Sequence, residues 1–173
     1  KRILPNGFVH SNFMMIGIAP SSNANPDGEK NSYFFDKTDN PTFAKNRKLL
    51  NDFFANIGID FETTWKTNVQ KCIGDSNEFS ENLEYFQTCF NANLKFEINT
   101  IKPKVIFALG TEVGKLFGAN EHSKVYFNDE FQCHVIKIWH PSYVLRGGTT
   151  EENFVHQCDK IENEIKELVI QNF

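Results

Sequence analysis

Residues 133–146 read CHVIKIWHPSYVLR and join an apolar run to a polar loop. The apolar and β-branched side chains of Cys133–Ile138 predict a buried strand. His140 follows where that strand leaves the sheet, and a histidine there can stabilise charge on a bound base. Ser142 can offer its hydroxyl and backbone N–H to a phosphate, and Arg146 can hold a second phosphate. Three other segments of the chain fit the same site, and they support a functional interpretation of this loop.

Further apolar runs predict strands that alternate with helices. The strands are expected at 13–18, 63–69 and 105–109, with a short hairpin strand around Tyr126, and the helices at 41–58, from 80 to 98, at 112–117 and from 151 to the tail. Four main buried strands that alternate with helices predict a three-layer α/β/α sandwich with a central, mostly parallel, four-stranded sheet. Without repeats or a low-complexity linker, residues 1–173 are expected to form a single domain.

The predicted strands all end in residues suited to a binding site. Ala19-Pro20, Asn68, Gly110 and His140 follow the four main strands in turn. In open parallel sheets, ligands bind beyond the carboxyl ends of the strands. These residues are therefore expected to converge on one edge.

Composition excludes some classes of protein. The net charge is -4, so contact with nucleic acid must come from a local basic patch and be sensitive to salt. No apolar run is long enough to span a membrane, and no signal-peptide pattern opens the sequence. The four cysteines form no CxxC pair, which favours thiols over disulfides. We expect a cytoplasmic monomer with no membrane partner.

Four segments, in chain order, resemble the uracil-DNA glycosylase superfamily. They are Gly17-Ile18-Ala19-Pro20-Ser21, Tyr33-Phe34-Phe35, Thr67-Asn68-Val69-Gln70-Lys71-Cys72 and His140-Pro141-Ser142-Tyr143-Val144-Leu145-Arg146. The resemblance covers nearly the whole chain and is closest to the cluster-containing bacterial and archaeal branches. It implies an enzyme that flips a base out of DNA and cleaves its N-glycosidic bond.

The resemblance also implies roles for individual residues. Gly17, Ile18, Ala19 and Pro20 would form the loop that positions the attacking water, and Phe34 would stack on the extruded base. Asn68 would read the Watson–Crick edge of the base, and His140 would donate to a base oxygen as negative charge develops on it. The DNA backbone would be gripped by Ser21, Ser142 and Arg146.

The first segment departs from the family pattern. Other branches carry an acidic or amide side chain where this chain has Ile18 or Ala19, and neither of these can orient water. A branch with a GLAPG-like loop shares this apolar character. The water would then be oriented by a polar residue elsewhere in the loop, among Asn23, Asn25, Asp27 and Glu29, and we favour Asp27.

Cys72 and Cys89 stand close to the spacing of two ligands of the family's [4Fe-4S] cluster. Two thiolates cannot hold a four-iron cluster, so the cofactor is expected only if an upstream CxxC supplies the other two. Both residues could equally be buried apolar thiols.

These observations favour a monofunctional DNA glycosylase that removes uracil or another deaminated base and leaves an abasic site. It would be monofunctional because no lysine stands in a motif position where it could form a Schiff base. Two alternatives stay open. One is a glycosylase for a bulky modified base in viral DNA, acting in anti-phage defence, and the other is a catalytically silent DNA-binding member of the superfamily.

Overall fold

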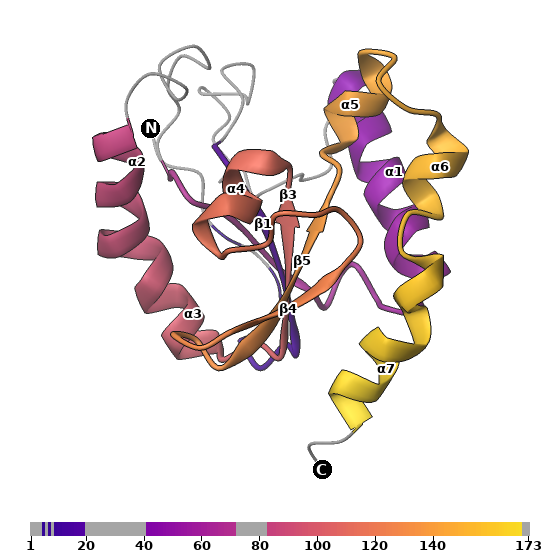
Figure 1. Ribbon diagram of the computed structural model, residues 1–173. Coiled ribbons are helices and arrows are strands. Elements are labelled where there is room, and N and C mark those ends of the chain that lie inside the picture. Colours follow the sequence, from indigo (N-terminus) through magenta and orange to yellow (C-terminus); the bar gives the residue numbers. More distant parts are fainter. Residues whose placement is uncertain (1–4, 6, 8, 20–40, 72–82, 171–173) are drawn as a thin grey trace.

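The computed structural model describes residues 5, 7, 9–19, 41–71 and 83–170. In this part of the chain a central sheet is covered by helices on both faces (Figure 1). The predicted α/β sandwich is therefore confirmed. No helix in the described ranges is long and apolar enough to cross a membrane.

The sheet has five strands in the described residues, in the order β2-β1-β3-β5-β4. The prediction of four strands was wrong by one, because the hairpin strand around Tyr126 joins the sheet. The strands are β1 (Phe13–Gly17), β2 (Trp65–Asn68), β3 (Val105–Leu109), β4 (Val125–Asn128) and β5 (Cys133–Ile138). The first three and β5 run parallel, whereas β4 pairs antiparallel with β5. All four predicted main strands thus end at the same edge of the sheet.

One face of the sheet packs against α1 (Pro41–Asn56) and the C-terminal helices. Leu49, Leu50 and Phe53 recur at helical spacing in α1 and are buried. The ring of Phe53 meets Phe107 of β3 edge-on at 5.9 Å and Phe154 at 6.1 Å. Aromatic contacts of this kind hold α1 to the sheet and to the C-terminal part of the chain.

The other face is covered by a helical segment in three parts and by α4 (Thr111–Leu116). The segment comprises α2 (Leu83–Cys89), a π-helical turn (Phe90–Leu94) and α3 (Lys95–Ile101). Its buried side chains at 86, 90, 94 and 98 stand four residues apart. In a straight α-helix, that spacing would turn the stripe by about 40° at each step. The wider π turn compensates for this drift, so that the stripe stays on the sheet.

The C-terminal region differs from the single closing helix that we predicted. It contains α6 (Glu151–Val155), a 3-10 turn (Asp159–Ile161) and α7 (Glu162–Ile170). Gln157 explains the break. Its amide donates to the Phe154 carbonyl at 2.8 Å and accepts from the Trp139 N–H at 2.8 Å, so the chain is tied to the end of β5 instead of continuing as a helix.

The loop predicted after β5 is also helical in part. Pro141–Leu145 form α5, with Pro141 in the first turn and His140 as the N-cap. Proline is favoured at this position because its missing N–H is not needed there. The short helix fixes the direction in which His140 leaves the sheet.

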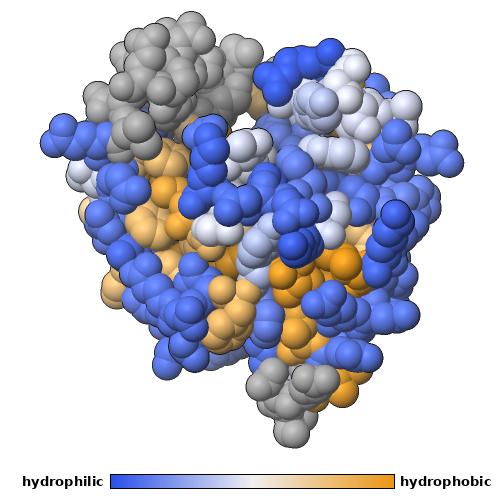
Figure 2. Space-filling view, viewed as in Figure 1, coloured by the Kyte–Doolittle hydropathy of each residue, from blue (hydrophilic) through white to orange (hydrophobic). Residues whose placement is uncertain are grey.

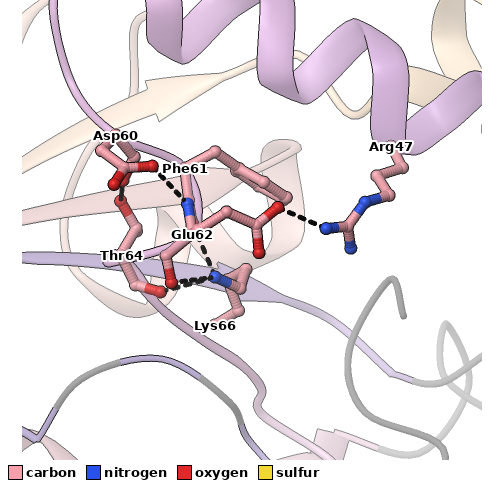
Figure 3. A network of polar contacts seen from close by, with 6 residues as sticks. All are labelled: Arg47, Asp60, Phe61, Glu62, Thr64 and Lys66. Carbon is pink, nitrogen blue, oxygen red and sulfur yellow. Dashed lines mark hydrogen bonds and ion pairs between the residues drawn. The ribbon is translucent and has the colours of Figure 1, made fainter. Parts of the chain in front are cut away.

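A buried lysine anchors the start of β2 (Figure 3). Lys66 is 1% exposed and its ammonium donates to the carbonyls of Phe61, Glu62 and Thr64 at 2.6, 3.1 and 2.9 Å. The ammonium also lies 4.7 Å from the centre of the Phe61 ring. Burial lowers the pKa of Lys66 to about 8. This turn delays the start of β2 to Trp65, two residues later than we predicted.

Candidate active site at the carboxyl edge of the sheet

The carboxyl ends of four adjacent strands carry most of the described candidate residues. Asn68 ends β2 and is paired in register with Gly17, which ends β1. The pairing continues beyond the strands, where Val69 N–H donates to the Gly17 carbonyl at 2.9 Å and Gln70 N–H to Ile18 at 3.0 Å. The predicted first and third segments therefore lie side by side.

The remaining two strands bring His140 to the same edge. Gly110 follows β3 with φ of 85° and its N–H donates to the Ile138 carbonyl at 2.8 Å. A Cβ placed on Gly110 would lie 3.8 Å from the Cβ of His140. Since neighbouring strands are about 4.8 Å apart, Asn68 and His140 flank a span of roughly 14 Å across three strand intervals. Such a span can receive one extruded nucleotide.

The hydrogen bonds of His140 define its tautomer. The Ser142 N–H donates to Nδ1 of His140 at 3.1 Å, and the Ser142 hydroxyl lies 2.7 Å from the same nitrogen. Nδ1 is therefore an acceptor, so the neutral ring carries its proton on Nε2. Burial lowers the pKa of His140 to about 4, and the positive charge of Arg146 adds to this shift. The imidazole is neutral at physiological pH and has one N–H to offer to a ligand.

The contacts of Ser142 differ from the expected one. Its backbone N–H is used by His140, so this group is not available to a phosphate in the present geometry. Ser142 is half-buried and Arg146 is exposed. Around α5, in the upper right of Figure 2, the surface is hydrophilic to neutral, and the hydrophobic residues in this view show on the left and lower down. This part of the edge suits a polar partner.

Lys71 supports the other end of the site. Its ammonium is buried and donates to the Asn68 carbonyl at 2.7 Å and to the Thr67 hydroxyl. It also forms an ion pair with Glu97 of α3 at 2.5 Å. Burial lowers the pKa of Lys71, and Glu97 opposes that shift. The backbone of Asn68 is thus held in place by a cation that is itself fixed to α3.

Several predicted site residues fall outside the described ranges. They are Pro20, Ser21, Asp27, Phe34 and Cys72. The structure brings Gly17, Ile18, Ala19, Asn68, His140, Ser142 and Arg146 to one edge of the sheet. Gly17 and Asn68 are buried there, and the other described candidates are half-buried or exposed.

A family model described as "Uracil DNA glycosylase superfamily" matches residues 5–163. The chain belongs to this superfamily. As a member of the uracil-DNA glycosylase superfamily, it is a DNA glycosylase, an enzyme that hydrolyses N-glycosidic bonds and acts on DNA. The match covers every strand of the described sheet and both ends of the candidate site.

The described cysteines do not fit the iron–sulfur cluster that some branches of this superfamily carry. Cys89 ends α2 and is half-buried, close enough to Lys71 to influence its pKa. Burial raises the pKa of Cys133 and of Cys158 to about 12, which disfavours the thiolate that iron requires. Among the described residues, no three potential ligands lie together. The thiols in the described ranges do not make a four-iron site.

Sequence reasoning missed Asn46 and the partnership of Lys71 with Glu97. Asn46 lies on the apolar stripe of α1, four residues before Leu50 and seven before Phe53. A polar residue at a stripe position of an amphipathic helix is a signal that the sequence did contain. The Lys71–Glu97 pair carries no such signal, because it joins segments 26 residues apart in different elements.

Proposed function

We propose that this enzyme is a monofunctional glycosylase that flips uracil or another deaminated base out of DNA and hydrolyses its bond to C1′. Water forms a bond to C1′ as the C1′–N bond breaks, and the electron pair leaves with the base. A proton from the water ends on the released base, and the DNA is left with an abasic site.

The observation that carries the proposal is the tautomer of His140. Because Nδ1 is occupied by the Ser142 N–H, the Nε2–H is the group available to a base oxygen. A neutral donor is suited to this task, since it stabilises the charge that develops on the leaving base without first protonating it. Asn68 would read the edge of the same base, and the Gly17–Ala19 backbone would border the attacking water. Asp27, Phe34 and Ser21 keep their predicted roles in water orientation, stacking and DNA contact.

The test is single-turnover cleavage of oligonucleotides that contain uracil, hypoxanthine or xanthine. His140→Ala is expected to slow cleavage by about 10²- to 10³-fold, the usual effect of removing one donor to a developing charge. His134→Ala is the matched control, because His134 lies near the start of β5, whereas His140 follows the end of that strand, and the His134 ring lies beside Phe127. Equal loss in both variants would contradict the proposed role of His140. Binding of DNA without product from any duplex would instead select the catalytically silent alternative.

A further inference from the structure

Two buried oxygen atoms on the α1 side of the site lack a hydrogen-bond donor. Among the described residues, the buried side-chain atoms without a partner are Oδ1 of Asn46, Oε1 of Gln70 and Nδ1 of His122. Each such atom costs roughly 1–3 kcal/mol unless a partner arrives. The ring of His122 contacts Trp139, which directly precedes His140, and burial together with the positive charge of Lys137 lowers the pKa of His122.

Asn46 is level with the carboxyl ends of the strands. It is 5% exposed and lies seven residues before Phe53, on the same stripe of α1 and about 10 Å nearer the start of the helix. Phe53 contacts Phe107 in the middle of β3, and Gly110 follows three residues later, about 10 Å along the strand direction. Helix α1 begins near α5, at the end of the sheet that carries the site (Figure 1). Asn46 therefore lies in the α1 layer, at the level of the sheet edge that carries the site.

Gln70 approaches the site from the end of β2. It is 3% exposed, and its backbone N–H is fixed by the Ile18 carbonyl. The side chains of its two neighbours point to the face covered by α2 and α3. Val69 belongs to the apolar core on that face, and Lys71 forms the ion pair with Glu97 of α3. Alternation along an extended chain directs the side chain of Gln70 to the opposite face, the one that α1 covers.

We propose that Asn46 and Gln70 are specificity residues that accept hydrogen bonds from the flipped base, which deepens and rests on the function proposed above. Uracil presents a single N–H on its pairing edge, and Asn68 suffices to accept it. Two further acceptors match a pyrimidine with additional donors. A cytosine that bears its exocyclic amino group and a hydroxylated substituent at C5 supplies them. The substrate class is therefore an amino- and hydroxyl-bearing pyrimidine.

The experiment compares duplexes that contain uracil, 5-hydroxymethylcytosine or glucosylated 5-hydroxymethylcytosine. Asn46→Leu and Gln70→Met remove the acceptors at nearly constant volume. Each is expected to lower kcat/KM for the hydroxylated cytosines, relative to kcat/KM for uracil in the same variant, by about 10- to 100-fold, the discrimination typical of a lost base contact. Asn46→Asp, which keeps an acceptor, should recover part of the loss. Asn51→Leu, at a half-buried position of the same helix, is the control.

Binding to 2′-fluoro nucleotides that resist cleavage separates this inference from the proposed function. Tighter binding of the wild type to the hydroxylated cytosine than to uracil, lost in both acceptor variants, supports the inference. Cleavage of uracil alone, with binding and kcat/KM equal in all variants, would overturn it and leave the proposed function standing. Failure of the wild type to cleave any of these duplexes would overturn the proposed function. In that case the binding series alone decides whether the two amides read a base.

Discussion

His140 combines a neutral ring, a fixed tautomer and a place beside the strand ends. Its pKa of about 4 predicts that the single-turnover rate shows no step near pH 6.5, where an ordinary histidine titrates. The rate should fall only as the pH approaches 4, because protonation then places a donor on Nδ1 and breaks the bond from the Ser142 N–H. A pH–rate profile measured with a cleavable duplex checks this. A limb centred near pH 6.5 would contradict the assigned environment of the ring.

The same shift links His140 to stability. Its pKa is lower in the folded state than in the unfolded chain, so the unfolded chain binds more protons between pH 6.5 and 4. The folded state therefore loses stability as the pH falls through that window, and none of this loss occurs above pH 6.5. A His140→Asn variant, which cannot titrate, should show a smaller drop in Tm over the same range.

At the scale of elements, α5 depends on the two glycines that follow it. A Cβ on Gly148 would lie 1.9 Å from Cε2 of Tyr143, whereas a Cβ on Gly147 meets nothing within 4 Å. In the wild type the ring centres of Tyr143 and Trp139 lie 6.1 Å apart. Gly148→Ala is expected to displace the Tyr143 ring from this position and to weaken DNA binding several-fold. Tryptophan fluorescence and a binding titration would measure the two effects.

Gly147→Ala is the companion variant. Gly147 has φ of 75°, so alanine there costs about 1 kcal/mol of backbone strain without touching the ring. If both variants changed fluorescence and DNA binding alike, backbone strain rather than the Tyr143 contact would be the cause.

The turn before β2 offers a second test at this scale. Lys66→Met keeps the apolar stem but leaves the three carbonyls of Figure 3 without their shared donor. We expect the free energy of unfolding to fall by about 1–3 kcal/mol in urea titrations at pH 7. Because the pKa of Lys66 is lowered to about 8, the wild type should gain stability as the pH rises from 8 towards 10.5. The methionine variant should lack that gain, and an unchanged rise would assign it to other groups.

The elements that could be predicted are those whose side chains repeat a simple pattern. Val105–Leu109 and Cys133–Ile138 were predicted at their observed bounds, because the first is a continuous apolar run that ends at Gly110 and the second is rich in apolar and β-branched side chains. The break after α6 could not be predicted, since it depends on a contact between distant residues, Gln157 and Trp139. Helix α5 has only five residues, too few to repeat an apolar pattern. The edge that carries Asn68 and His140 followed from the parallel order of the strands. The buried amides of Asn46 and Gln70 needed the packed structure.

At the scale of the whole molecule, the net charge is -4, so attraction to DNA must come from individual basic side chains at the site. Arg146 is exposed at the site, and its charge also lowers the pKa of His140. Arg146→Gln is expected to weaken binding to all sequences alike and to reduce the slope of log K against log salt by about 1. The pKa of His140 should rise at the same time, as measured by NMR titration. A change in base preference with an unaltered salt slope would contradict a phosphate contact.

The π-helical turn between α2 and α3 determines which side chains of α3 point towards the sheet. Removing a single residue from Phe90–Leu94 would rotate α3 by about 100° relative to α2. Glu97 would then point away from Lys71, and the cation beneath Asn68 would lose its counter-charge. A one-residue deletion about twenty residues from Asn68 would thus disturb the active site, although it removes none of the residues that form it.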